Sequence, residues 1–97
     1  MYVVTVKFDI KPNFLTDFTG LVLKQANDSM QLENNCLRFD VAYAEHDQNQ
    51  IYLYEIYLSK QDFDLHLQSE HFRTFSNNVS HMLVGKQVEC FVSMQIK

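Results

Sequence analysis

A histidine and a glutamate are the side chains of this sequence best suited to move a proton. His66 shares one face of a predicted helix with Phe63 and Leu67, at the i, i+3, i+4 spacing that brings side chains together. Glu55 lies among tyrosines and apolar residues in the strand-like run 51–57. Imidazole changes charge near neutral pH and is a common general base, while a carboxyl group among aromatic rings either pairs with a cation or has a raised pKa. We predict that both groups are catalytic, with His66 pointing at the sheet.

Each of these two residues also has a structural interpretation. A buried histidine is often satisfied by a neighbouring carboxylate or carbonyl group without taking part in a reaction. Glu55 could pair with Arg38 or His66 only to fix the sheet or a dimer contact. Arg38 and Asp40 lie two residues apart on one strand face and could join that network. The sequence leaves these interpretations open.

Asn27 is the candidate donor to a developing negative charge. It lies late in a predicted first helix, one position past the apolar stripe, where its amide could hydrogen-bond to a substrate oxygen. A surface asparagine near a helix end is the alternative. Large rings exclude water, so we expect substrate contacts from Phe39, Tyr54, Tyr57, Phe63 and Phe72, with His71 at the pocket rim. Tyr54 and Tyr57 occupy opposite faces of one strand, so only part of this set can face the same way.

Four strands and two helical regions must position these groups. Residues 2–10 alternate between apolar and mixed positions, the period of a strand with one buried side. Apolar residues then recur at helical spacing from Phe14 to about Leu32, after a break in which Asn13 is the expected N-cap. Further strands are expected at 36–44, 50–58 and 87–96, with a polar hairpin connection at 45–49.

The same patterns predict faces, helix ends and topology. One face of strand 36–44 should carry Leu37, Phe39, Val41 and Tyr43, and one face of the last strand Val88, Cys90, Val92, Met94 and Ile96. Ser59 and Asp62 resemble a capping box, Ser69 resembles a second cap that restarts the helix, and Gly85 fits the position just past its end. The order β-α-β-β-α-β predicts one α+β domain over residues 1–97, with ferredoxin-like topology and helices on one face of an antiparallel sheet. The second and fourth strands should lie at opposite edges.

Charge and composition exclude several classes of partner. The net charge is −4 and the eight Lys and Arg residues are scattered, so a basic nucleic-acid-binding surface is not expected. The sequence has no long apolar run and no signal-peptide pattern, which predicts a cytoplasmic protein without membrane contact. The four histidines and two cysteines show no metal-ligand spacing, so we predict no metal and treat Cys36 and Cys90 as buried reduced thiols. Eight Phe and five Tyr in so short a chain predict self-association.

Four short motifs resemble the antibiotic biosynthesis monooxygenase domain family. They are Cys36-Leu37-Arg38-Phe39-Asp40-Val41, Leu53-Tyr54-Glu55-x-Tyr57, Phe63-x-x-His66 and His71-Phe72. The resemblance covers essentially the whole chain in order and spacing. It implies a ferredoxin-like homodimer whose two sheets close into an α+β barrel, with a pocket between each sheet and its helices. The family includes cofactor-free quinol and anthrone monooxygenases and an isomerase of phosphorylated autoinducer-2, so membership does not fix the reaction.

Three functions therefore remain open. The leading one is a monooxygenase without cofactor that uses O2 and a quinol-like or polycyclic aromatic substrate, with His66 as base and Asn27 and a tyrosine as donors. The second is an isomerase of a small phosphorylated carbonyl compound, in which His66 and Glu55 form an acid–base pair. Its phosphate would need a cation, for which Lys24, Arg38 and Arg73 are the candidates. The third is a non-catalytic dimeric module that binds a hydrophobic ligand or a partner.

Overall fold

The computed structural model describes residues 1–95 and contains one β-α-β-β-α-β unit. Its strands are β1 (Tyr2–Ile10), β2 (Cys36–Ala44), β3 (Asp47–Tyr57) and β4 (Leu83–Val92). Its helices are α1 (Leu15–Leu32), α2 (Lys60–Gln68) and α3 (Glu70–Val79), with short 3₁₀ turns η1 (Pro12–Phe14) and η2 (Ser80–Met82). The predicted element order and the ferredoxin-like α+β class are confirmed. Within residues 1–95, none of the helices has the length and apolar character needed to cross a membrane.

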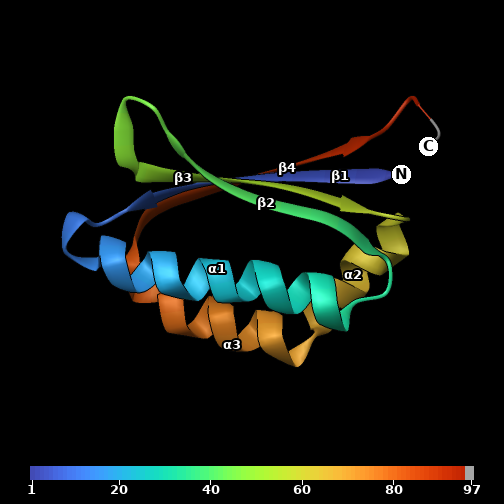
Figure 1. Cartoon of the computed structure of the whole chain (residues 1–97), viewed down its shortest axis with the longest axis horizontal. Coiled ribbons are helices and arrows are strands. Elements are labelled where there is room, and N and C mark those ends of the chain that lie inside the picture. The colour runs from blue at the N-terminus through green and yellow to red at the C-terminus, as the bar shows by residue number, and fades with distance from the viewer. Residues whose placement is uncertain (96–97) are drawn as a thin grey trace.

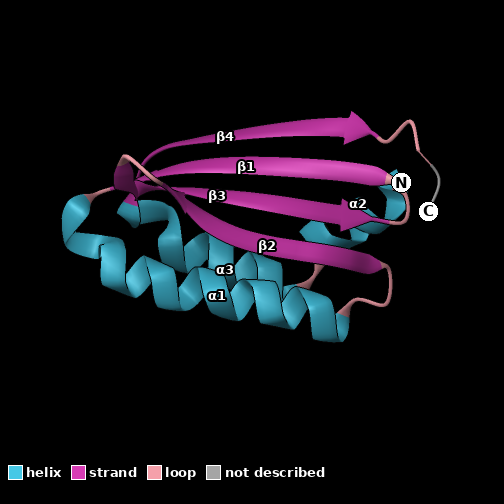
Figure 2. Ribbon diagram, turned by 45° about the horizontal axis from the view of Figure 1, so that its top comes forward, coloured by secondary structure: helices cyan, strands magenta, loops and turns pink. Residues whose placement is uncertain are grey.

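The four strands form one antiparallel sheet in the order β2-β3-β1-β4. Helices α1 and α3 lie side by side against one face of this sheet, and the opposite face is left uncovered (Figure 1). Figure 2 shows β2 and β4 at the two edges, as predicted for this topology. Side chains that point from the sheet toward the helices therefore form the core and the walls of any site.

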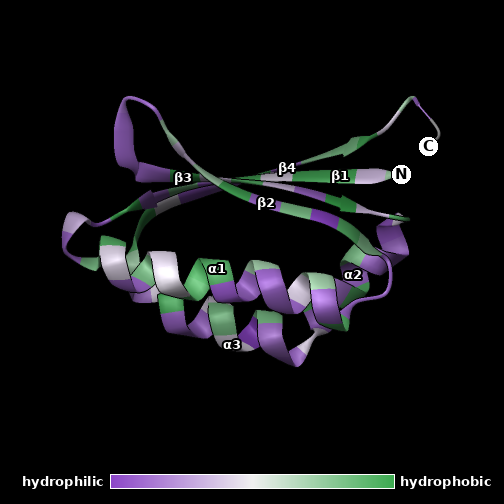
Figure 3. Ribbon diagram, viewed as in Figure 1, coloured by the Kyte–Doolittle hydropathy of each residue, from purple (hydrophilic) through white to green (hydrophobic). Residues whose placement is uncertain are grey.

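Alternation along the central strands builds the inner face of the sheet. The buried residues are Val4, Val6, Phe8 and Ile10 from β1 and Ile51, Leu53, Glu55 and Tyr57 from β3. Helix α1 buries Phe18, Val22, Gln25 and Ser29, which share one helix face. Each buried large apolar side chain contributes about 1.5–3 kcal/mol of transfer free energy. Polar residues gather instead at the turn between β2 and β3 (Figure 3). The inner layer still contains Glu55, Gln25 and Ser29, and buried polar groups need partners.

A β-bulge changes the face assignment at the start of β2. The register with β3 shifts between Cys36 and Arg38, so Leu37 is an extra residue in the pairing. Cys36 and Phe39 are buried, whereas Leu37 is exposed. The prediction that Leu37 shares the face of Phe39 is wrong, because simple alternation assumes a regular strand. Tyr43, beside a second register shift, is exposed as well.

The predicted caps of the two later helices are confirmed. The Ser59 side chain accepts a hydrogen bond from the backbone N–H of Asp62, and the Ser69 side chain accepts one from the N–H of Phe72. At the first helix the prediction is wrong. Asn13 lies inside the 3₁₀ turn η1, so it does not cap α1.

The hairpin and the last strand also differ from the prediction. β3 begins at Asp47, so only residues 45–46 connect it to β2. β4 begins at Leu83, and Gly85 lies inside it opposite Asp9 rather than at a helix end. The position predicted for Ile96 lies outside the described residues, and Met94 follows the end of β4 and is fully exposed.

The two cysteines have different environments. Cys36 is buried, and burial, assisted by the nearby carboxylates of Glu33 and Glu55, raises the pKa of its thiol to about 12. It therefore stays protonated and inert, as predicted for a structural thiol. Cys90 is exposed, contrary to the prediction. It lies on the edge strand β4, whereas α1 and α3 lie toward the other side of the sheet (Figure 2).

Candidate active site

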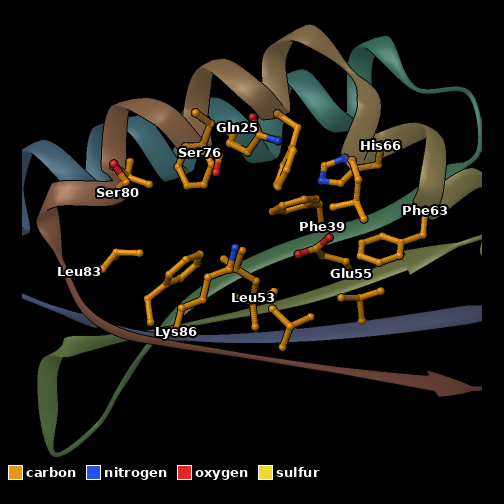
Figure 4. A pocket seen from close by; sticks show the side chains of 18 residues that line it. Gln25, Phe39, Leu53, Glu55, Phe63, His66, Ser76, Ser80, Leu83 and Lys86 are labelled. Atoms are coloured by element: carbon orange, nitrogen blue, oxygen red, sulfur yellow. The ribbon is translucent and has the colours of Figure 1, made fainter.

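A cavity of about 430 Å³ lies between the inner face of the sheet and helices α2 and α3. Most of its walls are apolar or aromatic. The polar exceptions are Gln25, Glu55, His66, Ser76, Ser80 and Lys86. Figure 4 shows Gln25 and His66 on the helical side of the cavity, with Glu55 and Lys86 on the sheet side. The volume is within the range of small-molecule sites, about 300–1,000 Å³.

His66 lies in the wall of this cavity and is only 2% exposed. Aromatic rings surround it, with centroid distances of 6.1, 5.4, 6.1 and 5.0 Å to Phe39, Tyr57, Phe63 and Phe72. Its Nδ1 atom lies 2.7 Å from Oε2 of Glu33. An ionised carboxylate can only accept a hydrogen bond, so this contact puts the ring proton on Nδ1. Nε2, which no group within residues 1–95 engages, keeps its lone pair.

Glu33 joins His66 to a second histidine. The same Oε2 atom accepts a hydrogen bond from Nε2 of His71 at 2.6 Å. The chain break at Ser69 makes this possible, because it puts His66 in the last turn of α2 and His71 at the start of α3. The Glu33 and His71 side chains are 16% and 10% exposed, so the bridge is largely shielded from water. These three side chains are also the group that could hold a metal ion.

The sequence interpretation placed Glu33 in a turn and gave it no role. Contact with His66 is made across 33 residues, which no local spacing reveals. The alternative of a histidine satisfied by a carboxylate is therefore correct for one ring nitrogen. It leaves the other nitrogen available to the cavity, so both interpretations of His66 hold in part.

Glu55 lies on the floor of the cavity beside Tyr57. The Tyr57 hydroxyl donates a 2.6 Å hydrogen bond to Oε1 of Glu55. Burial raises the pKa of Glu55 above its ordinary value, although Tyr57, His66 and Lys86 each act in the opposite direction. Burial and the adjacent carboxylate also raise the pKa of Tyr57, so it remains a phenol. The neutral acid form of Glu55 is favoured, which makes it a possible proton donor.

The alternative in which Arg38 pairs with Glu55 is wrong. Arg38 pairs instead with Asp40, with 2.6 Å between Nε and Oδ2, and its guanidinium lies 5.8 Å from the ring centroid of Tyr54. Tyr54 is opposite Thr5 and Asp40 in the sheet register, on the face away from the helices. Its side chain does not reach the cavity, contrary to the prediction. Tyr54 and Tyr57 do lie on opposite faces, as expected.

Gln25, rather than Asn27, brings an amide to the cavity. Asn27 is exposed on α1 and outside the cavity wall, so its predicted placement is wrong. Gln25 is 3% exposed, and within residues 1–95 its Oε1 has no hydrogen-bond partner. Its Nε2 lies 3.4 Å from Oγ of Ser29. A half-turn of the amide lets the Ser29 hydroxyl donate to Oε1 and turns Nε2 to the cavity side. The sequence signal was a glutamine inside the apolar stripe of α1.

The remaining predicted contacts divide into two groups. Phe39, Phe63 and Phe72 line the cavity as expected. Tyr57 is fully buried behind Glu55, and His71 lines a separate groove between α1 and α3 rather than the cavity rim. The aromatic set is therefore correct for the phenylalanines and mistaken for the edge residues.

Lys86 is the cation in the cavity wall. Its Nζ lies 5.8 Å from the ring centroid of Phe8 and 5.9 Å from that of Phe72. Sequence reasoning missed it because the last strand was expected to start one residue later. The cations named for a phosphate group lie elsewhere: Lys24 pairs with Asp28, and Arg73 donates to the carbonyl of Gln68.

Comparison with known proteins places this fold in a family. Residues 1–78 match the family model described as antibiotic biosynthesis monooxygenase. The chain belongs to this family. Membership supports a monooxygenase-like function in general terms.

Solved structures share the fold of this family member at low sequence identity. A protein from Nitrosomonas europaea, provisionally named an antibiotic biosynthesis monooxygenase, has a TM-score of 0.92 at 22% identity, and the alignment covers 98% of this chain and 100% of that one. A similarly named protein from Deinococcus radiodurans has a TM-score of 0.92 at 12% identity, covering 100% and 96%. A protein from Mycobacterium tuberculosis has a TM-score of 0.90 at 19% identity, covering 98% and 96%. The sequence matches no curated protein.

Proposed function

We propose that this protein is a cofactor-independent monooxygenase that oxidises a small quinol-like or polycyclic aromatic substrate with O2. The observation that carries the proposal is the unengaged Nε2 of His66 in the wall of a mostly apolar cavity, with Nδ1 fixed by Glu33. A ring held in this way can take a proton from an acidic O–H or C–H group of a bound substrate. The general family function agrees with this assignment.

The cavity walls favour a flat aromatic substrate. Phe39 comes from the sheet, Phe63 from α2, and Phe72 and Phe75 from α3. Rings in these positions can stack on or meet the edge of a substrate ring and exclude water from it. A highly charged substrate would lose its hydration in such a cavity with little compensation.

The proposed reaction balances without an added reductant. Nε2 of His66 accepts a proton from the substrate, and the resulting anion reduces O2 and forms a C–O bond, which gives a peroxide on that carbon. Cleavage of the O–O bond leaves one oxygen atom on the substrate as a carbonyl and releases the other as water. Conversion of a CH2 group to C=O supplies the four electrons that O2 accepts. Two substrate protons end in the water molecule.

Two further groups have roles in these steps. Glu55, whose burial favours the neutral acid, is placed to donate a proton to the departing oxygen. The Gln25 amide, once Ser29 donates to its Oε1, is placed to donate a hydrogen bond to the substrate oxygen that becomes negative. Glu33 holds the base in position and does not itself reach the cavity wall.

An isomerase of a small phosphorylated carbonyl compound is the main alternative. It would use the same His66 and Glu55 as an acid–base pair. A phosphate dianion needs compensating charge, and Lys86 is the single cationic side chain of the cavity wall among residues 1–95. The smaller charge complement favours the oxygenase.

We also propose that two chains associate through the uncovered face of the sheet. This face carries Tyr52, which is 44% exposed, and Phe91, which is 48% exposed. Exposed aromatic residues are enriched in protein interfaces, and apolar sheet faces are rarely left in water. A homodimer of this kind would cover them.

The test is O2 uptake by protein freed of metal and flavin, with a reduced naphthoquinone and an anthrone as substrates. With ¹⁸O2, one labelled atom per product molecule supports the monooxygenase. Exchange of carbonyl isomers without O2 uptake supports the isomerase. Ligand-dependent thermal stabilisation with no product indicates a binding module.

A further inference from the structure

Glu33, His66 and His71 form a cluster of which the proposed oxygenase reaction uses only part. Their Oε2, Nδ1 and Nε2 atoms lie within 4.8 Å of one another. Across residues 1–95, this is the group of three or more histidine, cysteine or acidic side chains that converges in this way. The three residues come from the end of α1, the last turn of α2 and the start of α3. Sequence spacing, on which the prediction of no metal was based, could not reveal a set assembled from three elements.

We propose that this cluster is a binding site for a divalent first-row transition metal such as Zn²⁺. Two imidazole nitrogens and one carboxylate oxygen are preferred ligands of this class of ion. Unlike exposed acidic clusters, all three side chains are mostly buried, with exposures of 3%, 10% and 16%. A rigid and partly dry setting holds the ligand atoms close together before an ion arrives.

The geometry requires only a small adjustment. Zinc bonds of about 2.0–2.2 Å in a tetrahedral arrangement put ligand atoms roughly 3.3 Å apart. The present contacts of Oε2 with the two nitrogens are 2.7 and 2.6 Å. Each must therefore lengthen by about 0.6 Å. Rotation about the side-chain bonds of Glu33, the most exposed of the three, can provide this movement.

An ion can reach the cluster without crossing the apolar cavity. His71 lines a groove of about 450 Å³ between α1 and α3, which opens to solvent. Asp28 and Glu70 also line this groove, and its one cation, Lys24, is paired with Asp28. The groove therefore has negative character, which raises the local concentration of cations.

Metal binding would change which nitrogen of His66 carries the proton. Without metal, Nδ1–H donates to Glu33. The metal takes the lone pair of Nδ1, so the neutral ring then carries its proton on Nε2, and the proton of His71 moves from Nε2 to Nδ1. Both rings stay neutral and no net proton is released. His66 can then donate to the cavity but cannot accept a proton, so the metal inhibits the base. This inhibition rests on the proposed function, whereas the metal binding does not.

Calorimetric titration of chelator-treated protein with Zn²⁺ tests the site. We expect one Zn²⁺ per chain, bound about tenfold or more weakly by His71→Asn and by Glu33→Gln. His46→Ala, which removes an exposed histidine in the β2–β3 turn, should bind like the parent protein. Thermal unfolding of each variant shows whether it is folded, and the Co²⁺ absorption spectrum of the unmodified chain reports the ligand set independently. Absence of binding, or equal affinity in His71→Asn and the parent protein, would overturn the proposal.

The ring tautomer gives a second readout that does not depend on activity. Long-range ¹H–¹⁵N spectra should show His66 with its proton on Nδ1 in the metal-free protein and on Nε2 after Zn²⁺ is added. An unchanged tautomer at saturating Zn²⁺ would contradict the site. Absence of O2 uptake in the metal-free protein would instead overturn the oxygenase and leave the zinc titration as a separate result.

Discussion

Nδ1 of His66 and Oε2 of Glu33 lie 2.7 Å apart, although the two residues are separated by 33 positions in the chain. The contact fixes both the orientation of the imidazole ring and the nitrogen that carries its proton. Nε2 is thereby left as a hydrogen-bond acceptor beside the cavity. A glutamate in a connecting turn thus determines what a histidine on the next helix can do.

Glu33→Gln should lower kcat for O2 uptake by about 10²-fold, with a much smaller change in KM. The amide NH2 of the new side chain can donate to Nδ1 and so allows the proton to move to Nε2. Steady-state kinetics and the ¹⁵N spectrum of His66 together measure the effect. Glu45→Gln, in the β2–β3 turn, is the matched control. An unchanged kcat in Glu33→Gln would remove Glu33 from the mechanism.

Gln25→Met should lower kcat by about 10- to 10²-fold, because it removes the amide donor and keeps the length of the side chain. The free energy of unfolding should stay level or rise by about 1 kcal/mol, since an unpaired buried oxygen is lost. Kinetics and urea unfolding measure the two effects. Asn27→Ala on the exposed side of α1 should change neither. A larger kinetic effect from Asn27→Ala would restore the donor that the sequence suggested.

Glu55→Gln should change the pH dependence of stability. Burial raises the pKa of Glu55 in the folded state above its model value of 4.5. Above that pH the unfolded chain releases a proton that the folded chain retains, so the folded state loses stability as pH rises toward the folded pKa. The slope from this group reaches at most about 1.4 kcal/mol per pH unit. The unfolding free energy of Glu55→Gln, measured from pH 4 to 8, should lack this decline. Parallel curves for the two proteins would show that Glu55 is not perturbed.

Tyr52→Glu should shift the protein from dimer to monomer in sedimentation velocity at micromolar concentration. A charge on the uncovered sheet face would have to be buried without a partner in the proposed contact. Leu65→Glu, on the exposed side of α2, is the matched control and should leave the dimer intact. A monomeric parent protein, or a dimer lost in Leu65→Glu instead, would place the contact elsewhere.

The fold was largely predictable from the sequence because its determinants are local. Alternation in β1 and β3, helical periodicity in α1 and the serine caps of α2 and α3 each act over a few residues. The bulge at Leu37 and the early start of β4 were missed, because register depends on the neighbouring strand rather than on the strand itself. Asn13 was mistaken for a cap because Pro12 begins a 3₁₀ turn there.

The site was only partly predictable, since it depends on contacts across the fold. His66 and the phenylalanines could be placed from helical and strand periodicity. Glu33 could not, because only the break between α2 and α3 brings both histidines to it. Asn27 and Gln25 differ by two positions, which turns a helical side chain from the buried face to solvent.

O2 uptake by His66→Ala, with protein freed of metal and flavin and a reduced naphthoquinone as substrate, tests the central claim most directly. Circular dichroism and thermal unfolding check that the variant is folded, and His81→Ala, which alters a histidine outside the cavity, is the control. The account predicts a decrease in kcat of about tenfold or more in His66→Ala and none in His81→Ala. Full O2 uptake by folded His66→Ala would contradict it.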